Sequence, residues 1–379
     1  MRVYLDNAAT TPIAKEVTHA ITEVLINDFG NPSSTHSFGR HVKAHIENSR
    51  RKVAKYINCS PSEIVFTSGG TEADNMALTS SICNLGIKRI ITSCIEHHAV
   101  GHTSTFLCEQ GRIKLDLVNI NKNGHVDLNH LEELLSTKEK TLVSLMHGNN
   151  EIGNLLPLQK VSQICRKHNA YFHSDTVQTM GHYLFDLEEL DIDFITCAAH
   201  KIHGPKGIGF LYVNKKNKPD AFIHGGSQER NMRGGTENVY GIVGLAKALE
   251  LAYNDLKEHQ DHVLGLKQYM IKELKKFSDD IYFHGDIDPE KSLYTVLNVC
   301  FPKTKKSTML LFTLDLKGVA ASGGSACTSG TNTSSHVLEG INADLNRPNV
   351  RFSFSRYTTK EELDYALQQI KCVFSTILV

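Results

Sequence analysis

Short apolar runs alternate with helical periods through most of this 379-residue chain, and this alternation constrains the fold more than any other sequence feature. The first helical period places Val17, Ala20, Ile21, Val24 and Leu25 on one helix face. Strands are predicted at 63–67, 88–93, 113–119, 141–146, 170–174, 193–198 and 207–213, with helices such as 128–135 and 157–168 between several of them. Such alternation is typical of an α/β fold whose mostly parallel sheet is covered by helices on both faces.

A second group of predicted elements follows Thr236. It consists of a long helical stretch at about 239–277, strands at 294–301, 318–322 and 349–355, and helices at 307–314 and 359–374. The hydrophobic content of 40% is enough for a large core, and a chain of this length favours two domains. We therefore expect a large domain over 15–255 and a smaller α+β domain formed by 1–14 and 256–379. The Ser-, Gly- and Thr-rich segment 322–335 is expected to be a mobile loop.

Composition excludes several classes of protein. Lys and Arg total 41, as do Asp and Glu, and no basic run suggests direct nucleic-acid binding. No stretch approaches the roughly 18 apolar residues of a membrane span, and the N-terminal residues contain no apolar signal region. We expect a soluble, cytoplasmic protein that binds no membrane. The nine cysteines contain no C-x-x-C pair, so neither a disulfide framework nor a metal site is predicted.

Polar residues gather where the predicted strands end, which is where ligands bind in open α/β sheets. The Gly-containing turn at 67–72 leads into a helix, whose free backbone N–H groups favour an anion. Other strand ends are followed by His97, Asn150, Asp175 and Gln178. Taken singly, each is more often an ordinary turn, a helix cap or a surface histidine.

Lys201 gives this pattern its chemistry. It ends the strand predicted at 193–198, and a lysine in a cleft at such a point is a candidate Schiff-base former, because desolvation and cationic neighbours make its amine nucleophilic. Asp175, at a neighbouring strand end, would hold a pyridine nitrogen protonated, as pyridoxal phosphate (PLP) requires. A lone lysine is usually solvated, but Lys201, Asp175, His97 and the Gly70–Thr71 turn together predict a PLP site.

These residues bring the chain close to a known family. It resembles the group I cysteine desulfurases, class V members of the fold-type I PLP-dependent transferases, over nearly its whole length. The matching motifs are Tyr-Leu-Asp-Asn-Ala-Ala-Thr-Thr-Pro (4–12), Gly-Asn-Pro-Ser-Ser (30–34), Phe-Thr-Ser-Gly-Gly-Thr-Glu (66–72), Asn-Asn-Glu-Ile-Gly (149–153), His-Lys (200–201), Gly-Pro-Lys-Gly-Ile-Gly (204–209), Arg-Gly-Gly-Thr-Glu-Asn (233–238), Ser-Gly-Gly-Ser-Ala-Cys (322–327) and Val-Arg-Phe-Ser-Phe-Ser-Arg (350–356).

The resemblance implies a role for each matching position. The catalytic residues would be Cys327, Lys201 and His97. The PLP-binding residues would be Gly70, Thr71, His97, Asn150, Asp175, Gln178, His200, Lys201 and, from the partner subunit of a homodimer, Thr236. Asn150 and Arg356 would bind the substrate, since the planar fork of an arginine suits a carboxylate.

The implied reaction converts L-cysteine to L-alanine and leaves the sulfur as a persulfide on Cys327. A thiolate in that role has to be accessible, which the Gly- and Ser-rich sequence around Cys327 favours, whereas the other eight cysteines are expected to be inert. The resemblance leaves the protein that accepts the sulfur open: an iron–sulfur scaffold, a tRNA-thiolation enzyme or another carrier. Relatives that serve a scaffold often extend beyond the last helix.

One of the departures from the family pattern bears on the cofactor, and two alternative functions stay open. Ala198 stands where family members usually carry a serine, so one phosphate contact is missing and weaker PLP retention is expected. A selenocysteine lyase would use the same cofactor, and its activity would survive loss of the Cys327 thiol. A non-catalytic paralogue would be expected to lack Lys201 or Cys327, and both are present.

Overall fold

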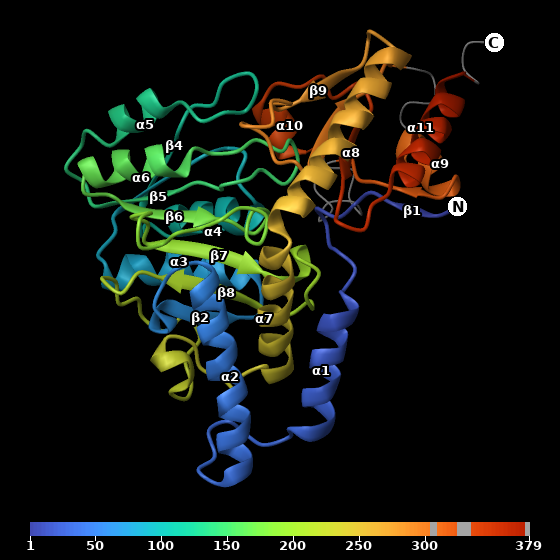
Figure 1. Cartoon of the computed structure of the whole chain (residues 1–379). Helices are drawn as coiled ribbons and strands as arrows, with labels where there is room; N and C mark the ends of the chain where they lie inside the picture. Colours follow the sequence, from blue (N-terminus) through green and yellow to red (C-terminus); the bar gives the residue numbers. More distant parts are fainter. Residues whose placement is uncertain (304–308, 324–334, 376–379) are drawn as a thin grey trace.

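The computed structural model describes residues 1–303, 309–323 and 335–375 (Figure 1). Its largest element is a seven-stranded sheet in the order β2-β8-β7-β6-β5-β3-β4. The strands are β2 (Ile64–Thr67), β3 (Arg89–Thr92), β4 (Lys114–Leu117), β5 (Thr141–Ser144), β6 (Tyr171–Asp175), β7 (Phe194–Ala198) and β8 (Gly209–Val213). Neighbours from β4 to β7 are parallel, and β8 is antiparallel to both β7 and β2. The predicted mostly parallel sheet is thus confirmed.

Helices cover both faces of this sheet. Successive strand residues point to opposite sides, so each face has apolar side chains that a layer of helices buries. Ile64 and Phe66 of β2 belong to one hydrophobic cluster, whereas Val65 between them belongs to another. The first cluster is completed by α1 (Lys15–Asn27), α2 (Ser37–Tyr56), α5 (Leu128–Leu134), α6 (Leu158–Lys167) and α7 (Val239–Asn254). The second is completed by α3 (Gly70–Asn84) and α4 (His98–Glu109). This double burial explains the apolar sequences of strands such as β2 and β8.

A smaller group of elements has its own hydrophobic cluster (Figure 1). It contains the antiparallel sheet β12-β10-β9 and the parallel pair β1-β11. Its elements are β1 (Val3–Tyr4), α8 (Leu256–Phe277), β9 (Tyr282–His284), β10 (Val296–Cys300), α9 (Leu310–Leu316), β11 (Val319–Ala320), β12 (Asn349–Ser353) and α11 (Lys360–Ser375). The short helix α10 (His336–Gly340) packs instead against Ile95 and Ile152. The helical stretch predicted at 239–277 is divided at Asp255, and β1, β9 and α10 were not predicted. The two-domain boundaries stay a prediction.

The N-terminal segment joins the two groups of elements. After β1, the chain runs to the end of β7, where the backbone N–H of Thr11 donates to the carbonyl of His200 at 2.9 Å. Closer to β1, the side chain of Asn7 donates to the carbonyl of Ser353 in β12, and the backbone N–H of Ala8 donates to the Ser353 hydroxyl. The segment therefore holds the end of β7 close to the smaller sheet. None of the described helices combines the length and apolar character of a bilayer-spanning segment.

Candidate active site

A cavity of about 210 Å³ lies where β6 and β7 end and α3 begins. Eight of the predicted site residues line it: Gly70, Thr71, His97, Asn150, Asp175, Gln178, His200 and Lys201. The same cavity is lined by Ala8, Ala9, Asp74, Met146, Val177, Ala198 and Arg351. Residues from distant parts of the sequence thus converge as the strand-end prediction requires.

Lys201 lies on a single 3-10 turn, Ala199–Lys201, directly after β7. Its Nζ donates to the backbone carbonyls of Ala8 at 2.6 Å and Ala9 at 2.8 Å. Gln178 Nε2 donates to the same carbonyl of Ala8 at 3.0 Å. The N-terminal segment therefore fixes the direction of the amine toward the cavity wall.

Buried acidic groups lie at another part of the cavity. Asp175 ends β6, and its Oδ1 accepts from the backbone N–H of Val177 at 2.9 Å. Burial, reinforced by nearby Asp74, raises the pKa of Asp175, and burial raises the pKa of Asp74 to about 7. A cation beside these carboxyl groups would stabilise their ionised forms. Asp74 was missed from the sequence, where only its place on α3 after the Gly70–Thr71 turn pointed to it.

His97 completes this acidic group. It is the N-cap of α4, where its Nδ1 accepts from the backbone N–H of Ala99 at 3.2 Å. Potential ligand atoms of Asp74, His97 and Asp175 all lie within 4.8 Å of one another. Burial lowers the pKa of His97 despite the opposing effect of Asp175, so the imidazole is neutral at neutral pH and can exchange protons.

The start of α3 gives the cavity an anion-binding end. The first residue of α3 is Gly70, whose backbone lies so close to Val177 that an added Cβ would be 2.7 Å from its Cγ2. Free N–H groups at a helix N-terminus favour a phosphate. Burial, together with the ammonium group of Lys201, lowers the pKa of His200 to about 4 and keeps this imidazole neutral. Ala198 contributes only a methyl group to this wall.

One predicted arginine does not line the cavity, whereas another arginine of the same motif does. Arg356 is not among the residues that line the cavity; it lies by a smaller one of about 10 Å³, near His182, His203 and His259. Arg351 of β12 lines the cavity instead. Its Nη2 lies 2.8 Å from Asp6 Oδ1, and its Nη1 donates to the carbonyl of Asn150 at 2.9 Å. Both arginines belong to the 350–356 motif, and the motif alone does not indicate which of them lines the cavity.

Two other predicted residues lie elsewhere or outside the described part. Thr236 is exposed and lines a separate cavity of about 120 Å³ with Ser68 and Arg233, so it does not reach the Lys201 cavity within this chain. Cys327 lies outside the described residues, as does most of the segment predicted to be a mobile loop.

The residues that line the cavity fit PLP. The amine of Lys201 can hold the aldehyde carbon, and the carboxylate of Asp175 can pair with the pyridine nitrogen. The N-terminus of α3 can bind the phosphate. Arg351 adds a buried Nε that has no hydrogen-bond partner, which suits an additional anionic group in the cavity. The donor set therefore matches an anionic aldehyde cofactor and a carboxylate-bearing ligand.

Comparisons with known proteins agree with this fit. The profile of the aminotransferase class-V family matches residues 3–366. "Cysteine desulfurase IscS" of Dictyoglomus turgidum is 43% identical, with 99% of this chain and 95% of that protein covered. The corresponding protein of Methanosarcina thermophila is 40% identical, with 97% and 91% covered.

Solved structures extend the likeness to the fold. A "NifS-like protein" has a TM-score of 0.91 at 37% identity, covering 99% of this chain and 100% of that one. "SspA in complex with cysteine" has a TM-score of 0.81 at 29% identity, covering 94% and 100%. Members of this family depend on PLP, and the fold is that of the NifS-like PLP enzymes. From the matched residues, the relatives and the cavity together, this chain belongs to the aminotransferase class-V family.

Proposed function

We propose that this chain is a PLP-dependent cysteine desulfurase, which converts L-cysteine to L-alanine and transfers the sulfur to its own Cys327. The observation that carries the proposal is the convergence of Lys201, Asp175, His97 and Arg351 on one cavity. Relatives named cysteine desulfurase and a structural neighbour described in complex with cysteine support the same substrate.

Each cavity residue has a proposed role that follows from its chemistry. Bound PLP supplies an electron sink, which makes the Cα proton of an attached amino acid acidic. Lys201 holds the cofactor and, once the substrate amine has displaced it, its Nζ accepts the Cα proton. Asp175 would pair with the protonated pyridine nitrogen, a cation that would stabilise the ionised form of this buried carboxyl group. His97, a neutral imidazole in the same cavity, could exchange protons with a bound substrate.

Arg351 is the residue we propose for the substrate carboxylate. It is 1% exposed, lines the cavity, and has a buried Nε without a hydrogen-bond partner. Its contacts with Asp6 and the carbonyl of Asn150 fix the plane of the guanidinium before a ligand arrives. A fixed guanidinium presents paired donors to a carboxylate at little entropic cost. This proposal replaces the sequence-based assignment of that role to Arg356.

The sulfur step balances without an external oxidant. The Cys327 thiolate attacks the substrate Sγ, so that an S–S bond forms while the Cβ–Sγ bond breaks. The carbon fragment keeps that electron pair and takes up protons, which yields alanine. The enzyme is left with a persulfide, whose outer sulfur passes to an acceptor. Cys327 lies outside the described residues, so its role rests on the Ser-Gly-Gly-Ser-Ala-Cys motif.

The decisive experiment measures sulfide and alanine released from L-cysteine, with PLP and a reductant present. Wild-type protein is expected to release both in equal amounts, and Cys327→Ala is expected to release neither. Cys83→Ala is the control, because Cys83 is an exposed cysteine near the end of α3 and does not line the cavity. It should behave as wild type.

Two outcomes would contradict the proposal. Wild-type protein that is yellow with PLP but forms no alanine would refute cysteine as the substrate. Alanine formation that survives in Cys327→Ala would refute the persulfide step and favour a selenocysteine lyase. A homodimer to which Thr236 contributes, an iron–sulfur or thiolation acceptor and a cytoplasmic location remain predictions from the sequence.

A further inference from the structure

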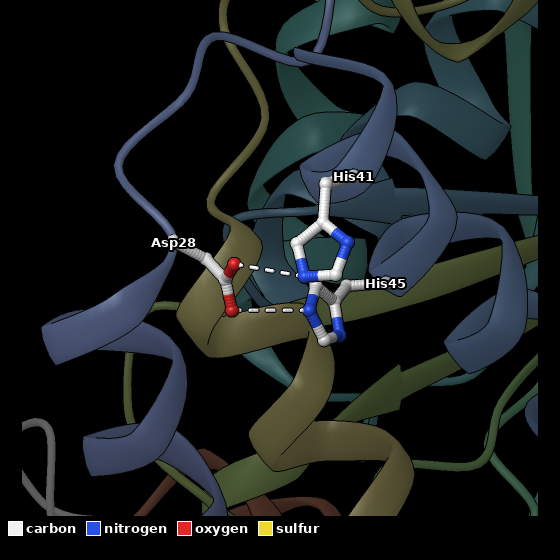
Figure 2. A group of neighbouring side chains, drawn as sticks. All are labelled: Asp28, His41 and His45. Carbon is white, nitrogen blue, oxygen red and sulfur yellow. Dashed lines mark ion pairs between the residues drawn. The ribbon is translucent and has the colours of Figure 1, made fainter. Parts of the chain in front are cut away.

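Asp28, His41 and His45 form a compact group, none of whose members lines the cavity around Lys201 (Figure 2). Asp28 immediately follows α1, and its backbone N–H bonds to the carbonyl of Val24, which fixes the end of that helix. His41 and His45 stand four positions apart on α2, so their side chains share one helix face. Figure 2 shows the carboxylate of Asp28 turned toward both imidazole rings.

The distances bring three potential ligand atoms together. His41 Nε2 lies 3.1 Å from Asp28 Oδ1, and His45 Nε2 lies 3.1 Å from Asp28 Oδ2. The three ligand atoms all lie within 4.8 Å of one another. Ligands of one tetrahedral zinc ion, each about 2.0–2.2 Å from the metal, have separations of this order.

His45 distinguishes this group from an ordinary set of hydrogen bonds. Its Nε2 is buried but has no hydrogen-bond partner, even though a carboxylate oxygen lies 3.1 Å away. The ring nitrogen is therefore close to Asp28 without pointing an N–H at it. A buried polar atom without a partner is unusual in a folded protein and often marks the position of a water or an ion.

We propose that Asp28, His41 and His45 bind one divalent transition-metal ion of the zinc class. Two imidazoles and one carboxylate are ligands that such an ion accepts, and a carboxylate with only 11% of its side chain exposed supplies the negative charge. The side chain of His41 is 67% exposed, so the fourth coordination position faces solvent and takes water.

Metal binding would tie the end of α1 to the second and third turns of α2. The connection between these helices, residues 28–36, carries no regular helix or strand of its own. An ion held from both sides would fix this connection, because it binds the folded chain and not the unfolded one. The site is separate from the cavity around Lys201, so this inference holds or fails independently of the proposed enzymatic activity.

The test uses PLP-loaded protein, in which the cofactor occupies the Asp74–His97–Asp175 group that would otherwise compete for metal. Wild type, Asp28→Asn and His45→Gln are dialysed against zinc chloride, and bound zinc is counted by elemental analysis. Zinc on cysteine thiols is common to all the proteins and cancels in the comparison. Both variants are expected to bind one zinc fewer per chain than wild type.

His19→Gln is the matched control. His19 is an exposed histidine on α1 with a carboxylate neighbour, Glu23, at 3.2 Å, but it is not part of a three-ligand group. It should keep the wild-type zinc count. A second measurement follows the melting temperature: zinc should raise it in wild type and His19→Gln, but not in His45→Gln. If Asp28→Asn does not fold, the solvent-exposed His41→Gln takes its place.

Equal zinc counts in wild type, Asp28→Asn and His45→Gln would overturn the proposal, leaving a solvated histidine–carboxylate cluster. A loss of the same size in His19→Gln would also overturn it, because binding would then follow the number of surface histidines and not their geometry.

Discussion

Arg351 and Arg356 belong to the same short segment, yet their surroundings differ in kind. Arg351 lines the cofactor cavity and lies 2.8 Å from the carboxylate of Asp6. Arg356 lies among imidazoles, and its Nη1 is 3.9 Å from the carboxylate of the largely exposed Asp255. The first arginine is fixed by a carboxylate inside a cavity large enough for a ligand, and the second faces a space of about 10 Å³.

The histidines around Arg356 show how a largely buried cation is tolerated without a close carboxylate. Burial, with a smaller contribution from the nearby Arg356 guanidinium, lowers the pKa of His182 and His203 to about 4 and that of His259 to about 2. Neutral imidazoles do not repel the guanidinium. The cavity of about 10 Å³ between them holds one water at most. The comparison teaches that the role of a motif arginine is decided by its neighbours, since both arginines satisfy the same motif.

The largest expected effect compares the two arginines directly. Arg351→Gln should lower kcat/KM for L-cysteine roughly 100-fold, because it removes charged hydrogen bonds worth about 1.5–3 kcal/mol each. Arg356→Gln should lower it much less. Steady-state kinetics with PLP-saturated proteins measures both, and absorbance of the bound cofactor checks loading. A greater loss in Arg356→Gln would restore the sequence-based assignment.

The next effect concerns stability at acid pH. Because the pKa values of His182, His203 and His259 are lower in the folded chain than the value of about 6.5 in the unfolded chain, the unfolded state binds more protons between about pH 6.5 and pH 4. The free energy of unfolding should therefore fall as the pH falls through this range. Replacing one histidine removes up to about 1.4 kcal/mol per pH unit from that slope.

His259→Gln is the variant for this test, with His19→Gln as an exposed control. Urea unfolding at about pH 7 and about pH 5 gives the slope for each protein. His259→Gln should show the shallower dependence, and His19→Gln should match wild type. Parallel slopes for His259→Gln and wild type would mean that the histidine cluster takes up its protons without unfolding.

The smallest effect concerns the anion-binding end of the cofactor cavity. Ala198 is 2% exposed, and its Cβ would be 3.7 Å from a Cβ placed on Gly70. Ala198→Ser should add one hydroxyl donor to the phosphate site and slow PLP loss during dialysis by roughly tenfold, since one such bond contributes about 1.5 kcal/mol. Ala199→Ser, on the adjacent and fully buried residue that does not line the cavity, is the control. Unchanged PLP loss in Ala198→Ser would refute the missing-contact interpretation.

The sequence predicted the large sheet well, because its strands are short apolar runs bounded by polar turns. The seven strands lie within or close to the predicted ranges, for example β6 at Tyr171–Asp175 against 170–174. The missed elements have weak local patterns: β1 has two residues, and it forms only by pairing with β11. The break between α7 and α8 was missed because neither glycine nor proline marks Asp255.

The residues of the candidate site were predicted less completely than the strands of the large sheet. Strand ends brought Lys201, Asp175 and His97 together because parallel strands finish at one edge of a sheet. Arg351 was missed because β12 belongs to the smaller sheet, and no local pattern reveals which strand of one sheet faces a cavity in another. His41 and His45 show helical spacing, but the third member of their group, Asp28, lies on the far side of a turn.

The hydrogen bonds from Lys201 to Ala8 and Ala9 have a consequence for the order in which the protein matures. The segment that contains β1 is made before β11 and β12, yet β1 pairs with β11 at Val319, and Asp6 contacts Arg351 of β12. Contacts between such distant parts of a chain form slowly and late. The segment that carries Ala8 and Ala9 is therefore placed only after β11 and β12 have been made, so the Lys201 amine gains its two carbonyl partners late in folding.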